Sequence, residues 1–167
     1  MNNFFKQIDK ISRWAGSISS WFILLQMLVT VAIVIERHFF HRGDDWAFEL
    51  SWMFYSLVFL FAFAFTLAEK GHVKVDVLSN RYSFRVRAIV DSISYLALVL
   101  LCSLMVWNGI NYAKTAWMIK ECSWHTTAGA PVYPIKTMIP VAFGLLGLQG
   151  IVEFIRSLAL AVKGKKE

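Results

Sequence analysis

The residues able to do chemistry in this sequence are few, and the densest group lies between positions 38 and 49. It combines imidazole and carboxylate side chains: His38, His41, Asp44, Asp45 and Glu49. Such groups bind zinc when three or four of them converge on one point. Their spacing here matches no ligand pattern of a tight metal site. The sequence therefore favours a solvated polar loop over a metal centre.

A second group is the pair Glu153 and Arg156, which interrupts an apolar run. A carboxylate inside a membrane helix can take up and release protons, which is the chemistry of a proton-coupled transporter. Arg156 follows Glu153 at i+3, where the two side chains meet on one helix face. The spacing favours an ion pair at the membrane boundary, and a proton relay stays open as an alternative.

The histidines do not fall where a membrane haem protein needs them. Haem takes axial ligands such as histidine, and in a helical membrane protein these lie within the helices. His38, His41, His72 and His125 all lie in predicted loops or at helix boundaries. No nucleophile–base pair or phosphate-binding glycine loop is present in the sequence. We therefore expect no enzyme activity and no cofactor bound by this chain.

Long uncharged runs separate these polar groups. The chain has 167 residues, of which 57% are apolar, whereas roughly 45–50% is usual in soluble domains. A helix needs about 20 apolar residues to cross a bilayer, and in lipid its backbone groups must be satisfied within the segment. The sequence predicts an all-α integral membrane protein, one domain over residues 1–167. Its four transmembrane helices are expected at about 14–35, 50–68, 92–113 and 137–162.

Lysine and arginine are distributed unevenly between the loops. Twelve of the 17 lie in the N-terminal segment, the second loop and the C-terminal end, against five in the first and third loops. Because cytoplasmic segments carry this excess, both termini are predicted to be cytoplasmic. The bias accounts for the net charge of +6 and favours anionic lipid headgroups, without a nucleic-acid partner. Tyr82, Val86 and Ile89 recur at helical spacing and predict a short interfacial amphipathic segment before the third helix.

Three glycines recur at every third position of the fourth helix: Gly144, Gly147 and Gly150. Small residues let two membrane helices approach closely. The stripe is therefore predicted to be a packing face, whose partner is a helix of this chain or of another protein.

Several segments together are similar to one known family. Trp46-Ala-Phe-Glu49 leads into the second helix, His72-Val-Lys-Val-Asp76 follows that helix, and residues 134–149 carry two prolines and the first glycines. With the four helices, these segments resemble the small membrane subunit (DctQ-like) of tripartite ATP-independent periplasmic (TRAP) transporters, over about residues 14–162. That family often has two acidic residues after the tryptophan, whereas Phe48 precedes the single Glu49 here. A role for a carboxylate pair at this position is therefore not expected.

The resemblance implies a division of labour between three proteins. In that family a large membrane subunit binds substrate and sodium ions, and a periplasmic substrate-binding protein delivers the substrate, usually an organic acid. It implies that this chain is a multi-pass protein of the bacterial inner membrane and a non-catalytic scaffold subunit. Structural or subunit-contact roles are expected for Trp46, Glu49, His72, Asp76, Gly144, Gly147, Gly150, Glu153 and Arg156.

Two other classes of function stay open. A self-contained small homo-oligomeric transporter built around Glu153 predicts uptake or efflux by the chain alone, abolished by Glu153→Gln. A membrane enzyme or redox subunit predicts a bound cofactor that is visible in an absorbance spectrum.

Overall fold

The computed structural model describes residues 2–41, 45–69, 84–124 and 129–163. These residues form four helices: α1 (Asn2–Phe39), α2 (Asp45–Ala68), α4 (Phe84–Met118) and α5 (Tyr133–Lys163). Each of them is long and apolar enough to cross a membrane. The four predicted spans are therefore confirmed as four long apolar helices.

The helices extend beyond the apolar runs that predicted them. α1 begins at Asn2 instead of near position 14, and α4 begins at Phe84 instead of near position 92. Charged residues bound the apolar runs without ending the helices, because Lys, Arg and Glu are good helix formers. With 38 residues at ~1.5 Å each, α1 is about 57 Å long and exceeds the ~30 Å hydrocarbon core. From Phe84 on, the expected amphipathic segment is the beginning of α4 and not a separate helix.

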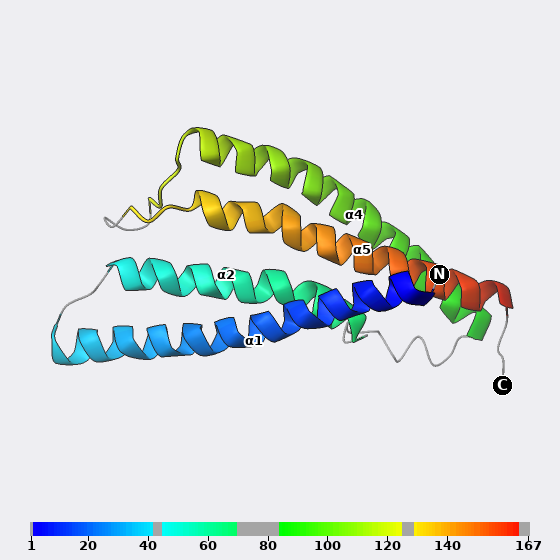
Figure 1. Ribbon diagram of the computed structural model, residues 1–167, viewed down its shortest axis with the longest axis horizontal. Coiled ribbons are helices and arrows are strands. Elements are labelled where there is room, and N and C mark those ends of the chain that lie inside the picture. Colours follow the sequence, from blue (N-terminus) through cyan, green and yellow to red (C-terminus); the bar gives the residue numbers. More distant parts are fainter. Residues whose placement is uncertain (1, 42–44, 70–83, 125–128, 164–167) are drawn as a thin grey trace.

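The four helices form two antiparallel hairpins (Figure 1), α1 with α2 and α4 with α5. α5 also contacts α2 and α1. In the most apolar stretch of α5, 39% of the residues are buried, against 6% in α1. α5 is therefore the central helix. The start of α1 and the end of α5 lie at one end of the bundle, here called the terminal end, and the starts of α2 and α5 lie at the other, here called the loop end (Figure 1).

Each hairpin has its own site of close approach. A Cβ atom added at Gly16 of α1 would lie 2.4 Å from Cγ of Phe65 on α2. In the second hairpin, a Cβ atom at Gly109 of α4 would lie 3.3 Å from Cδ of Pro140 on α5. A small buried cluster of Leu67, Cys102 and Leu146 joins α2, α4 and α5. Glycine and small residues thus set the spacing within the hairpins, as expected where two membrane helices pack closely.

The connection from α4 to α5 is held by its own backbone hydrogen bonds. The N–H of Ser123 donates to the carbonyl oxygen of Ala130 at 2.8 Å, and the N–H of Val132 donates to that of Glu121 at 3.1 Å. Pro134 follows in the first turn of α5, where proline costs the helix no hydrogen bond. The connection therefore fixes Glu121 beside the first turns of α5.

Candidate functional site

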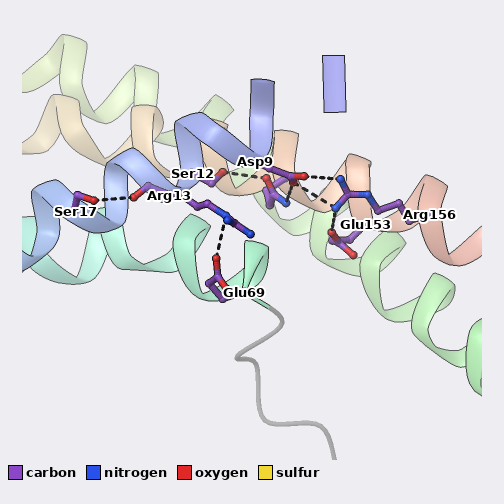
Figure 2. Close-up of polar contacts among 8 residues, drawn as sticks. Asp9, Ser12, Arg13, Ser17, Glu69, Glu153 and Arg156 are labelled. Atoms are coloured by element: carbon purple, nitrogen blue, oxygen red, sulfur yellow. Dashed lines mark hydrogen bonds and ion pairs between the residues drawn. The ribbon is translucent and has the colours of Figure 1, made fainter. Parts of the chain in front are cut away.

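A polar cluster joins α1 to α5 near the terminal end of the bundle (Figure 2). It contains Asp9 and Ser12 of α1 and Gln149, Glu153 and Arg156 of α5. These five residues are called the α1–α5 cluster below. The side chains of Ser12, Gln149 and Glu153 are buried, so their polar atoms depend on one another for hydrogen bonds.

The guanidinium group of Arg156 lies between two carboxylates. Its Nη2 donates to Oδ2 of Asp9 at 2.6 Å, and its Nη1 donates to Oε1 of Glu153 at 2.5 Å. Nη1 also lies 3.3 Å from Oδ1 of Asp9. The i,i+3 ion pair expected between Glu153 and Arg156 is thus present. Charge-assisted hydrogen bonds of this kind are about twice as strong as neutral ones.

Gln149 completes the contact between the two helices. Its Nε2 donates to Oδ1 of Asp9 at 2.9 Å, and its Oε1 accepts from Oγ of Ser12 at 3.0 Å. Both ends of this fully buried amide are therefore bound to α1. The sequence reasoning missed Asp9, Ser12 and Gln149. The available signals were an amide inside an apolar span and a single acidic residue in a basic N-terminal segment.

The chemistry of the cluster suits holding two helices together. A guanidinium group stays protonated at any physiological pH, and here it contacts both carboxylates. Glu153 is thereby held in an ion pair with Arg156. Each residue of the cluster forms a hydrogen bond to another member. The cluster therefore stabilises the contact between α1 and α5, because its hydrogen-bond donors and acceptors bind one another.

A second ion pair lies close by and links α1 to Glu69, the residue that follows α2 (Figure 2). Nε of Arg13 lies 3.0 Å from Oε1 of Glu69, and the two side chains are 64% and 44% exposed. Exposed ion pairs contribute about 0.2–1 kcal/mol. This pair is therefore a weak contact beside the partly buried α1–α5 cluster.

The three glycines of α5 do not share one environment. A Cβ atom added at Gly147 would lie 3.2 Å from Cβ of Cys102, and one at Gly150 would lie 3.2 Å from Cγ2 of Val99. Both positions therefore face α4. A Cβ atom at Gly144 would meet nothing within 4 Å. The stripe divides into two positions packed within the chain and one beside open space.

Glu49 is fully buried, and Trp46 near it is exposed. α2 begins at Asp45, which is the acidic residue of its first turn. The helix begins five residues before Leu50, where the apolar run begins, so Glu49 lies beyond its first turn. Oε2 of Glu49 accepts a hydrogen bond from Nε1 of Trp52 at 3.1 Å. Glu49 is a buried acceptor within α2.

The remaining sequence-predicted positions divide between described and undescribed parts of the chain. His72 and Asp76 lie outside the described residues, as does Asp44 of the loop cluster. Among the residues that the structure describes, no three His, Cys, Asp or Glu side chains are placed to hold a metal ion.

Comparison with known protein families gives one match. The model of a family described as "Tripartite ATP-independent periplasmic transporters, DctQ component" matches residues 26–160. The matched range covers most of the chain, from the middle of α1 to near the end of α5. A search of curated proteins finds no match.

Proposed function

This chain belongs to the DctQ component family of tripartite ATP-independent periplasmic transporters, and on that premise we propose that it is the scaffold subunit of a sodium-coupled importer of organic acids. The family is a non-enzymatic transport family of the inner membrane. The chain is accordingly a transport component of that membrane. The tripartite system implies two partners, a large membrane component and a periplasmic binding protein.

In this proposal the large subunit binds the substrate and the sodium ions, and this chain packs against it without moving substrate itself. The observation that carries the proposal is the α1–α5 cluster. Glu153 is the single acidic residue in the sequence of α5, and it is engaged by Arg156 in a contact that also includes Asp9. A group that holds two helices together is poorly suited to exchange protons or ions in each transport cycle.

The outward faces of the bundle offer the surface for such a partner. Trp21 and Leu28 of α1 and Leu104 of α4 are among the most exposed large apolar side chains. Membrane helices associate through van der Waals packing and hydrogen bonds between such faces. In the proposed orientation both termini are cytoplasmic, as the lysine and arginine distribution favours.

The test is reconstitution of the complete system and of its parts. We expect the chain to co-purify with its large membrane subunit in mild detergent. Proteoliposomes with both membrane subunits and the binding protein should take up the organic acid when a sodium gradient is applied. Proteoliposomes that contain this chain alone should show no uptake. Uptake by the chain alone, lost in Glu153→Gln, would instead support the self-contained transporter.

A further inference from the structure

A cavity of about 290 Å³ lies between the two hairpins at the loop end of the bundle. One wall is α2, with Trp52, Ser56 and Leu60, and the facing wall is α5, with Lys136 and Ile139. The cavity is separate from the α1–α5 cluster, which lies at the terminal end (Figures 1 and 2). The family assignment does not account for it.

The cavity is charged at one end and apolar at the other. Nζ of Lys136 lies 2.5 Å from Oε1 of Glu121 and 4.1 Å from the centre of the Tyr112 ring. Lys136 is in the first turn of α5, while Ile139 is one turn deeper and Leu60 lies well inside α2. In a bilayer the charged pair would lie at headgroup depth and the apolar walls would lie in the hydrocarbon. Trp124, which also lines the cavity, is of the residue type enriched at that boundary.

The size of the cavity restricts what can occupy it. A helix with its side chains is ~10 Å wide, so a volume of 290 Å³ would hold less than one turn. The same volume equals about ten water molecules at ~30 Å³ each, but buried water needs several polar partners. Such partners lie at the charged end, with Lys136 and Glu121, whereas Leu60 and Ile139 deeper in the cavity offer none. A hydrocarbon chain fits both the volume and the walls.

The ion pair of Lys136 and Glu121 restricts which kind of lipid headgroup can bind beside it. The ammonium group of Lys136 has three N–H donors and the carboxylate of Glu121 has two acceptor oxygens. Their mutual contact uses one of each and Tyr112 takes a second donor of Lys136, so one N–H and one carboxylate oxygen are left, and the side chains remain 13% and 30% exposed. A phosphate oxygen can therefore accept from Lys136 while an amine of the same headgroup donates to Glu121. An anionic headgroup would place uncompensated negative charge beside Glu121, and a choline headgroup has no N–H to donate.

From the cavity and the charged pair together, we propose that this site binds a zwitterionic phospholipid with a primary-amine headgroup. One acyl chain lies between α2 and α5, and the headgroup contacts Lys136 and Glu121. The lipid fills the space between the hairpins at the loop end, where the α1–α5 cluster does not reach. The proposal concerns the chain itself and holds whichever substrate the transporter carries.

The test uses native mass spectrometry of the purified full chain, titrated with phosphatidylethanolamine, phosphatidylcholine and phosphatidylglycerol of identical acyl chains. Ser56→Phe fills the cavity, and Ser103→Phe on the exposed face of α4 is the matched control. Both serine hydroxyls donate to the carbonyl oxygen four residues earlier, of Trp52 and Val99. We expect Ser56→Phe to bind phosphatidylethanolamine about tenfold more weakly than the wild type, and Ser103→Phe to match the wild type. Equal affinity in all three proteins, or equal loss in both variants, would overturn the site.

A headgroup variant tests the second half of the proposal. Glu121→Gln should retain lipid but lose the preference for phosphatidylethanolamine over phosphatidylcholine. A wild-type chain without that preference would overturn the headgroup assignment.

Photolabelling keeps the proposal testable if Ser56→Phe does not fold. Phosphatidylethanolamine with a photoactivatable acyl chain should label residues 52–60 or 135–139 of the wild-type chain. Labelling confined to other segments contradicts the proposal. So does loss of this labelling in the complex with the large subunit, since a partner side chain would then fill the cavity.

Discussion

Arg156 and Asp9 are in direct contact, with Nη2 of the guanidinium group 2.6 Å from Oδ2 of the carboxylate, although 147 positions separate them in the sequence. Their contact joins the first helix to the last. Gln149 adds a neutral hydrogen bond to the same carboxylate at 2.9 Å. The N-terminal turns of α1, which precede its uncharged run, are therefore part of the packed structure and not only a basic anchor.

Asp9→Asn should destabilise the chain more than the matched variant Glu69→Gln. Asp9→Asn removes the carboxylate charge that pairs with Arg156, and Glu69→Gln removes the one that pairs with Arg13. The Asp9 pair is partly buried, whereas the Glu69 pair is exposed. We expect a loss of about 1.5–3 kcal/mol for Asp9→Asn and below about 1 kcal/mol for Glu69→Gln. Unfolding in one detergent, followed by tryptophan fluorescence, measures both. Equal losses would show that the α1–α5 cluster is no stronger than a surface pair.

The four helices and the pair within α5 were predictable because both depend on local pattern. An uncharged run of sufficient length predicts a span, and residues three apart share a helix face whatever the fold. The contacts of Asp9 depend instead on how α1 lies against α5. A single acid among basic residues is only a weak local signal for Asp9, because a solvated acid gives the same pattern. The burial of Glu49 was missed because α2 begins at Asp45, before the apolar run that predicted it, which places Glu49 inside the helix.

Gly147→Leu should weaken the packing of α4 on α5, whereas Gly144→Leu should not. A Cβ atom at Gly147 would lie 3.2 Å from Cβ of Cys102, closer than ordinary van der Waals contact, so α4 and α5 must shift apart to admit a larger side chain there. Overpacking of this kind costs about 1–3 kcal/mol. The measurement is the unfolding temperature of the isolated chain. If Gly144→Leu leaves that temperature unchanged but reduces co-purification with the large subunit, then Gly144 faces the large subunit.

Gly16→Ala should separate α1 from α2 at their crossing point. The added Cβ atom would lie 2.4 Å from Cγ and 2.9 Å from Cβ of Phe65, close to the α2 backbone, where the side chain has little freedom to move. We expect a destabilisation of about 1–3 kcal/mol, partly reversed in the double variant Gly16→Ala/Phe65→Ala. A double variant no more stable than Gly16→Ala would locate the strain elsewhere.

Glu153→Gln should leave sodium-driven uptake by the complete transporter intact. The amide oxygen of glutamine can still accept from Nη1 of Arg156, and Asp9 still balances the guanidinium charge. The measurement is substrate uptake in proteoliposomes at matched amounts of assembled complex. Abolished uptake with normal assembly would mean that Glu153 takes part in transport, which contradicts the scaffold proposal.

The central position of α5 has a consequence for biosynthesis. Chains are made from the N-terminus, so the helix that contacts the other three is the last to reach the membrane. Until α5 is inserted, Asp9 and Ser12 lack the side chains that they bind in the finished bundle. A chain that ended shortly before Gln149 would contain three of the four helices but lack this contact between the hairpins. In such a chain the polar side chains of Asp9 and Ser12 would lack the partners on α5 that satisfy them in the finished bundle.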